Sequence, residues 1–225
     1  MPLHSDQWWL PPPAPRDRPP EMRVASAICA AVDAVIAGEA KNAFCAVRPP
    51  GHHASPASTM GFCVFNNVVV GGVEQARKAH GLKRVVLVDF DVHHGNGTQT
   101  VYRADPDVMV ASIHQAMIFP MSGAKHETGA GNIVNVSILH NVPAAQFRDA
   151  FETGLLPRLR DFRPELILLS AGFDAHLSAP LADQKLAPAD FTWLTEQLME
   201  VADSCCGGRL FSILKGGYIS SAAAQ

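Results

Sequence analysis

The segment from Arg84 to Gly97, RVVLVDFDVHHGNG, joins a short apolar run to a group of ionisable side chains. Its first half, Arg84–Asp89, is rich in valine and has the length of a β-strand. From Asp89 onward it carries two aspartates, two histidines and two glycines, which are typical of a functional loop. The segment therefore predicts a buried strand that ends at a polar site.

Five further apolar runs of similar length lie along the chain, and segments with helical spacing separate several of them. The runs cover Ala43–Val47, Val108–Ile113, Ile133–Ile138, Leu166–Ser170 and Leu210–Leu214. The apolar spacing predicts helices over residues 21–40, 66–79, 144–162 and 188–205. Short β-branched runs that alternate with helices indicate an α/β fold, a parallel sheet with helices on both faces in a three-layer sandwich.

The chain has 225 residues, of which 48% are apolar, and this suits a single domain with a substantial core. Residues 1–20 contain seven prolines, which fix φ and remove amide donors, so we expect an irregular arm there. The domain is then expected to cover residues 21–225.

Composition and charge exclude several classes of protein. The net charge of −3 gives no basic excess for direct nucleic-acid binding, and no apolar run is long enough to span a membrane. The N-terminus lacks the pattern of a signal peptide. The five cysteines are scattered and odd in number, which favours free thiols and a cytoplasmic location. The oligomeric state is left open by these patterns.

Polar motifs follow four of the apolar runs, just past the point where each run ends. They are Asp89–His94, His114–Gln115, Gly172–Asp174 and Gly216–Tyr218. In open α/β sheets, ligands bind at the carboxyl ends of the strands. The four motifs are therefore expected to meet at one edge of the sheet and to form a site.

Asp91 and His93 are two residues apart, so their side chains share a direction while strand geometry persists. A carboxylate and an imidazole on one side suit zinc. The alternative interpretation of the same pattern is a glycine-rich loop whose aspartates cap the next helix and whose histidines lie at the surface. Asp174 is the best third ligand, since it ends an apolar strand, and its alternative role is also a helix cap. Two carboxylates and one histidine leave coordination positions open, as a catalytic zinc requires.

His52 and His53 follow two prolines and a glycine, and neighbouring imidazoles resist simultaneous protonation. One of them can therefore stay neutral near pH 7 and act as a base, while solvated loop histidines are the alternative. Tyr218 follows two glycines, so its hydroxyl could reach the site and donate to an oxyanion. A packed turn aromatic is the alternative for Tyr218.

Taken together, the motifs resemble the histone deacetylase family and related bacterial amidohydrolases, most closely the class II branch. The matching stretches, in order, are RPPGHHA, GFCVFNNV, VDFDVHHGNGTQ, SIHQ, GAGNIVNV, SAGFDAH and GGY. The resemblance covers about residues 21–218 and implies an arginase-like α/β sheet that holds one zinc ion per chain. It implies hydrolysis of an acyl (acetyl) group from an amine, in the first place an N-acyl-lysine.

The resemblance also assigns roles to individual residues. Asp91, His93 and Asp174 match the zinc ligands, and His53 matches the general base beside His52. Asp89 matches the residue that orients His52, Asn96 faces His53, and Tyr218 matches the tyrosine that polarises the acyl carbonyl. Gly61, Phe62 and Phe119 match the walls of the acyl channel, and Ser112 resembles part of a structural potassium site.

Three departures from the family pattern leave alternatives open. Relatives carry more sequence before residue 21 and after the GGY motif, so the catalytic domain of residues 21–225 is expected to be shortened at both ends. Lys215 stands where class II relatives often have glutamate. Polyamine-selective relatives place acidic residues at the pocket rim, where this chain has Leu181. An acetylpolyamine amidohydrolase and a truncated, non-catalytic zinc- or acyl-lysine-binding paralogue are therefore the alternative functions.

Overall fold

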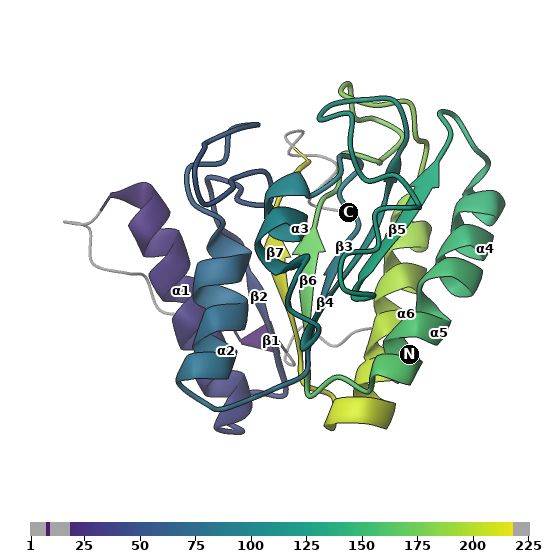
Figure 1. Cartoon of the computed structure of the whole chain (residues 1–225). Helices are drawn as coiled ribbons and strands as arrows, with labels where there is room; N and C mark the ends of the chain where they lie inside the picture. The colour runs from purple at the N-terminus through teal and green to yellow at the C-terminus, as the bar shows by residue number, and fades with distance from the viewer. Residues whose placement is uncertain (1–7, 10–18, 218–225) are drawn as a thin grey trace.

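The computed structural model describes residues 8–9 and 19–217, and a parallel β-sheet forms its centre (Figure 1). Within these residues the sheet has seven strands in the order β1-β2-β7-β6-β3-β4-β5, and every pair of neighbours is parallel. The strands are β1 (Trp8–Trp9), β2 (Asn42–Cys45), β3 (Val85–Asp89), β4 (Val108–Gln115), β5 (Ile133–Ile138), β6 (Leu166–Ala171) and β7 (Leu210–Leu214). The predicted parallel α/β sheet is confirmed.

Helices cover both faces of this sheet and give three layers (Figure 1). One face packs against α1 (Pro20–Ile36), the π-helix η2 (Val68–Val73), α2 (Glu74–Lys78) and α3 (Asn96–Tyr102). The other packs against α4 (Ala144–Gly154), α5 (Leu156–Phe162) and α6 (Pro188–Cys206). In β3, Val85 and Leu87 belong to the first apolar cluster, whereas Val86 and Val88 belong to the second. A strand buried on both faces must be apolar at every position, which explains its unbroken valine-rich run.

The helical segment that follows the GFCVFNN motif packs closely against α1. The predicted helix over residues 66–79 is present, but Val68–Val73 forms a π-helix before α2 begins. A side chain at Gly71 would lie 2.7 Å from the Ala25 carbonyl and 2.8 Å from Ile28. Glycine therefore allows η2 to approach α1 at backbone distance.

Several element boundaries differ from the prediction, since α1 ends at Ile36 and β2 at Cys45, and two further differences have a clear physical reason. The single helix expected over residues 144–162 is broken at Leu155, because Pro157 lacks an amide hydrogen and fits only the first turn of a new helix. Strand β4 continues through His114 and Gln115, which were expected to follow it. Both pair with β5, opposite Ser137 and Ile138, so polar residues continue a strand that the apolar pattern ended too early.

The N-terminal segment also contains an element that the sequence did not predict. Trp8–Trp9 forms β1, parallel to Asn42–Ala43 of β2, within the segment expected to be irregular. Short helix α3 was likewise not predicted, since its sequence begins in a glycine-rich motif. In the described part of the chain, no helix has both the length and the apolar character needed to cross a bilayer.

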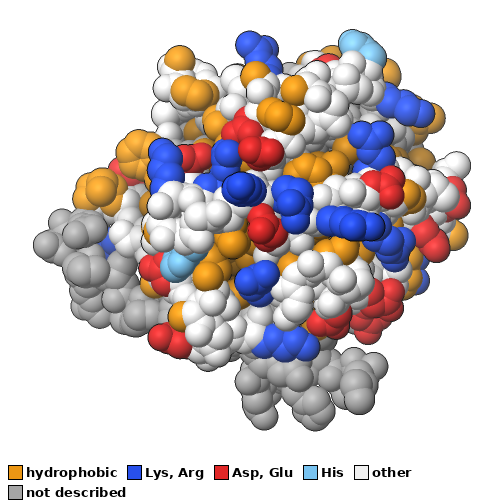
Figure 2. Space-filling model, turned by 60° about the horizontal axis from the view of Figure 1, so that its bottom comes forward, with side chains coloured by type: hydrophobic (Ala, Val, Ile, Leu, Met, Phe, Trp, Pro, Cys, Tyr) orange, Lys and Arg blue, Asp and Glu red, His pale blue; other side chains and the backbone are white. Residues whose placement is uncertain are grey.

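The site-bearing loops emerge at the carboxyl ends of the strands, at the top of Figure 1. After β3 the chain passes through α3 to β4, whereas after β6 it passes through α6 to β7, on the opposite side. The loops that follow these two adjacent strands thus part in opposite directions, which opens a crevice between them. The amino-terminal end of the sheet instead shows Lys and Arg side chains interspersed with Asp and Glu (Figure 2).

Candidate metal centre and adjoining cavity

Asp91 and Asp174 come from the two loops that part at this crevice. Asp91 lies two residues past the end of β3, and Asp174 three residues past the end of β6. Asp89, the last residue of β3, pairs in register with Ser170 of β6, so the two loops start side by side. The alternative of helix-capping aspartates is not realised: no side-chain cap is present on α3, and Asp174 lies in a loop well before α6.

His93 completes a compact cluster with the two aspartates. Its Nδ1 lies 2.9 Å from Asp174 Oδ2 and 3.1 Å from Asp91 Oδ1. The three candidate ligand atoms all lie within 4.8 Å of one another. Backbone amides orient the carboxylates, since Val92 N–H donates to Asp174 and His93 N–H donates to Asp91. Two carboxylates and one imidazole at this spacing fit a zinc ion with open coordination positions.

The buried carboxylates of this cluster depend on a positive charge beside them. Burial, together with the nearby Asp174 carboxylate, raises the pKa of Asp91 to about 6. Burial opposes ionisation of His93, but its hydrogen bonds to Asp174 and Asp91 raise its pKa to about 10. Although burial also works against ionisation of Asp174, the same contact with His93 lowers its pKa. Buried carboxylates of this kind call for a cation as their partner.

Two glycines give these carboxylates their space. A side chain at Gly172 would lie 2.3 Å from Asp91 Oδ2. One at Gly216 would lie 2.5 Å from the same oxygen and 3.0 Å from Asp174 Oδ2. Sequence reasoning gave Gly172 no role and Gly216 only that of positioning Tyr218, and their place in the GFD and GGY motifs was the only available signal for this steric role.

The histidine pair lies beside the cluster and is buried, unlike the solvated loop histidines of the alternative interpretation. His52 Nδ1 donates to Asp89 Oδ2 at 2.9 Å, and His53 Nδ1 donates to Asn96 Oδ1 at 2.8 Å. Because both partners are acceptors, each Nδ1 carries the hydrogen and each Nε2 keeps its lone pair. The Nε2 of His52 lies 4.0 Å from Asp91 Oδ2, so the pair faces the candidate metal centre.

The environment of the pair holds both rings neutral. Burial is the main cause that lowers the pKa of His52. Burial and then the neighbouring His52 lower the pKa of His53 to about 3, against a smaller opposing effect of Asn96. A neutral amide stabilises an imidazolium less than a carboxylate does. His53 is thus the ring of the pair with an uncharged orienting partner and a free Nε2.

A cavity of about 210 Å³ brings the predicted residues together. Its lining comprises Pro50, His52, His53, Gly61, Phe62, Asp91, His93, Phe119, Asp174, Leu181 and Lys215. Phe119 contacts His53 edge to face, with ring centroids 5.0 Å apart. A side chain at Gly61 would lie 2.3 Å from the His53 ring, so glycine allows the loop to close over that histidine. The cavity thus joins the candidate metal centre to apolar walls.

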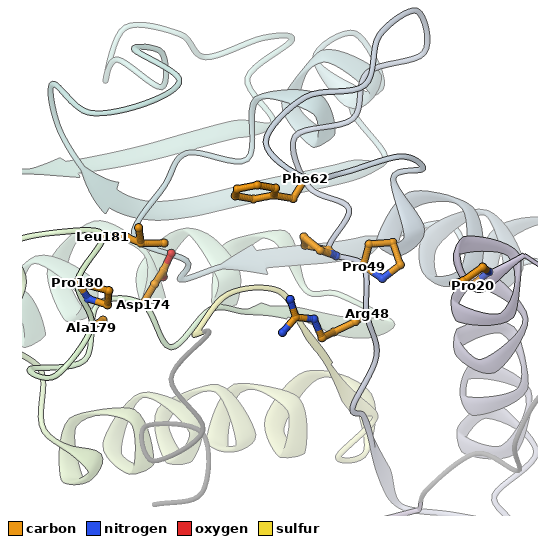
Figure 3. Close-up of a pocket in the computed structure, with 9 residues that line it drawn as sticks. Pro20, Arg48, Pro49, Phe62, Asp174, Ala179, Pro180 and Leu181 are labelled. Atoms are coloured by element: carbon orange, nitrogen blue, oxygen red, sulfur yellow. The ribbon is translucent and has the colours of Figure 1, made fainter.

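A wider cavity of about 630 Å³ adjoins the first and shares with it Pro50, Phe62, Asp174 and Leu181. In Figure 3, Phe62 lies above it, Asp174 and Leu181 lie across from Pro49, and Arg48 points into it. Phe62 has a positive φ of 62° and a largely exposed side chain. The mouth of the site is therefore apolar, with a single guanidinium beside it.

Two predicted residues remain to be placed. Tyr218 lies outside the described residues. Ser112 is buried, and its Oγ lies 2.8 Å from His114 Nδ1. The potassium site near Ser112 stays a prediction.

Sequence reasoning also missed the structural importance of Lys215. Its side chain is buried in the cavity wall, and its ammonium group donates to Asn67 Oδ1. Burial lowers its pKa to about 8, so the ammonium form predominates at pH 7. The sequence marked Lys215 only as a departure from the usual glutamate.

The chain combines a parallel α/β sheet with a carboxylate–imidazole centre at its carboxyl edge, and a histidine pair lies beside that centre. These features place it in a class of metal-binding α/β proteins. Residues 20–225 match the histone deacetylase domain, and the chain belongs to the histone deacetylase family. The predicted family is confirmed.

Individual relatives agree with this assignment. The chain is 44% identical over 179 residues to histone deacetylase 10, chloroplastic, of Oryza sativa subsp. japonica, covering 78% of this chain and 40% of the relative. It is 43% identical over 194 residues to the histone deacetylase-like amidohydrolase of Pseudomonas aeruginosa, covering 84% and 51%. The crystal structure of the HDA15 HD domain superposes with a TM-score of 0.84 at 36% identity, covering 91% of this chain and 60% of that one. This chain thus spans about half the length of the curated relatives that it matches.

Proposed function

We propose that this protein is a zinc-dependent amidohydrolase that removes an acyl group, in the first place acetyl, from the amine of an acyl-lysine. The observation that carries the proposal is the meeting of Asp91, His93 and Asp174 with the neutral histidine pair in one cavity. One group of residues can hold a cation, and the other can move protons.

Asp91, His93 and Asp174 would hold one zinc ion in this proposal. A bound zinc ion would polarise the acyl carbonyl and lower the pKa of a water molecule. His53 has its Nδ1 hydrogen committed to Asn96, so its Nε2 is the atom that takes the proton of the attacking water. His52 donates its Nδ1 hydrogen to the Asp89 carboxylate and would help the histidine pair carry a positive charge. A protonated histidine of the pair would then return a proton to the leaving amine. Tyr218 would donate to the oxyanion.

The cavity walls favour a lysine-like stem over a polyamine. In the described part of the chain, the only carboxylates that line the 210 Å³ cavity are Asp91 and Asp174, and Leu181 stands at the rim. Arg48 lines the wider cavity beside it. A polycation would gain no counter-charge from these walls beyond the two proposed metal ligands, whereas an apolar stem would be desolvated by Phe62 and Phe119.

Turnover of an acetyl-lysine peptide is the direct test. We expect activity that is lost on removal of metal by a strong chelator and restored by added zinc. His53→Ala should lose roughly 100- to 10,000-fold in kcat at unchanged zinc content, the usual contribution of a general base. His140→Ala, which removes an exposed histidine, is the control and should match the parent.

The same assay separates the alternatives. Full activity of rigorously metal-free protein would contradict the proposed mechanism. Zinc binding without turnover of any acyl amine would favour a non-catalytic paralogue. A strong preference for acetylated polyamines over the peptide would reverse the substrate assignment.

A reducing compartment such as the cytoplasm is proposed as the location of this protein, and the free state of all five cysteines supports it.

A further inference from the structure

Lys215 occupies an unusual place for a lysine. Among the described residues it is the only lysine or arginine that is buried, with an exposed fraction of 3%. It directly follows β7, which lies in the middle of the sheet, and directly precedes Gly216. A buried charge of this kind is costly unless other groups compensate it.

Hydrogen bonds fix the position of the ammonium group. Lys215 Nζ donates to Asn67 Oδ1, and Asn67 Nδ2 donates to the carbonyl of Pro49 at 3.1 Å. Asn67 is buried, and a side chain at Gly51 would clash with it, so its amide has little freedom to move. The ammonium group is therefore held at the base of the loop that carries His52 and His53.

The charges that face this ammonium group are carboxylates in and beside the candidate metal centre. Lys215 lines the same cavity as Asp91 and Asp174, and its charge interacts favourably with Asp89 and Asp91. The next residue, Gly216, abuts Asp91 Oδ2 and Asp174 Oδ2. A cation in this position attracts the carboxylates and repels any second cation that they bind.

We propose that Lys215 is an internal counter-charge of the metal centre, which stabilises the carboxylates of the metal-free protein and thereby lowers its affinity for zinc. The inference rests on the proposed function only in taking Asp91, His93 and Asp174 as the zinc ligands. It makes Lys215 a residue that tunes metal retention, held in place by Asn67.

The test measures the dissociation constant of zinc by competition with a chromophoric chelator, using the full chain. Lys215→Gln removes the charge and keeps an amide donor for Asn67 Oδ1. We expect it to bind zinc at least about ten-fold more tightly than the parent, because even a partly screened repulsion between nearby cations is of this size. The metal-free form of this variant should also unfold at a lower temperature than the metal-free parent.

Three further variants separate charge from packing. Lys215→Arg keeps the charge, so its zinc affinity should stay near that of the parent. Asn67→Asp places a carboxylate against the ammonium group, and it should tighten zinc binding although Lys215 remains. Lys41→Gln makes the same change of net charge at an exposed lysine paired with Asp203, and it should leave the zinc affinity unchanged.

The outcomes are distinct from those that test the proposed function. If Lys215→Gln and Asn67→Asp bind zinc no more tightly than the parent, the counter-charge role is refuted while the zinc site stands. If the parent itself fails to bind zinc, the metal centre and the inference fall together. Tighter zinc binding by Lys215→Gln and Asn67→Asp than by the parent, with unchanged zinc affinity in Lys41→Gln, would support the inference.

Discussion

At the scale of single residues, the sequence predicted the groups whose neighbours lie within a few positions. Asp91 and His93 could be paired because strand geometry relates residues two apart, and Asp174 because it ends an apolar run. The contact between Lys215 and Asn67 joins positions 148 residues apart, so no local pattern reveals it. The steric role of Gly216 was hidden for the same reason, since it depends on how β7 lies beside β6.

Asp174→Ala should abolish tight metal binding while the protein stays folded. It removes one of three ligands, whereas the core strands on either side keep their apolar contacts. We expect zinc affinity to fall by at least about 100-fold, because even loss of a supporting hydrogen bond costs 10- to 100-fold. Equilibrium dialysis measures the zinc content, and Asp183→Ala, an exposed aspartate of the same loop, is the control. Stoichiometric zinc in Asp174→Ala would refute the ligand assignment.

Asn96→Asp should move the acid limb of the activity profile to higher pH. A carboxylate beside Nδ1 would stabilise the imidazolium form of His53, whose pKa burial holds at about 3 in the parent. The base works only when it is neutral, so a raised pKa means that activity is lost at a higher pH as the solution is acidified. The check is the pH dependence of kcat/KM for parent and variant. An unchanged or lowered acid limb would assign the base role to another group.

At the scale of elements, the prediction was accurate where apolar periodicity defined a segment and failed where polar contacts did. Strand β4 runs two residues beyond its apolar stretch because its polar end is satisfied internally. His114 Nε2 donates to the Gly123 carbonyl at 3.0 Å, and its Nδ1 accepts from Ser112 Oγ. This ring therefore ties β4 to the loop that follows it, in a neutral tautomer that no periodicity could indicate.

The buried neutral His114 should make the protein less stable in mild acid. Burial and then the neighbouring His94 lower its pKa from 6.5 to about 4 in the folded state. Between these values the unfolded chain binds a proton that the folded chain does not, so stability falls as the pH drops from 6.5 towards 4. The contribution of His114 is on the order of 2 to 3 kcal/mol by pH 4.5.

Urea unfolding of the metal-free protein at pH 7 and pH 4.5 measures this loss. His114→Gln keeps a donor for the Gly123 carbonyl but does not titrate in this range, so it should lose less free energy of unfolding than the parent. Equal losses in the parent and in His114→Gln would show that His114 does not couple to folding in this way.

At the scale of the whole molecule, the order of the strands could not be read from the sequence, although the class of fold could. Alternation of strands and helices predicts a parallel sheet, but it does not tell which strands are neighbours. The structure places β7, the last described strand, between β2 and β6. Phe211 of β7 lies opposite Ala43 and Leu168 and is fully buried. The centre of the sheet thus depends on segments from both ends of the described chain.

Phe211→Ala should therefore destabilise the whole domain. Truncation of a buried phenylalanine removes apolar contacts and leaves a cavity, at a cost of about 3 to 5 kcal/mol. Phe62→Ala is the matched control, because that ring is 79% exposed and its loss should change stability by no more than about 0.5 kcal/mol. Chemical denaturation of the metal-free proteins measures both. Similar stabilities for the two variants would contradict the central role of β7.

The central position of β7 also sets the timing of assembly during synthesis. Strands β2 and β6 are synthesised before β7, and neither can gain its neighbour on that side until residues 210–214 have been made. Until then the nascent chain can form only two partial sheets with open edges, and the pairing of β7 with the distant β2 forms slowly because of its long sequence separation. Because Lys215 and Gly216 arrive with this same strand, the pocket is finished only when the sheet closes. Translation that stalls before β7 would leave aggregation-prone edges for chaperones to shield.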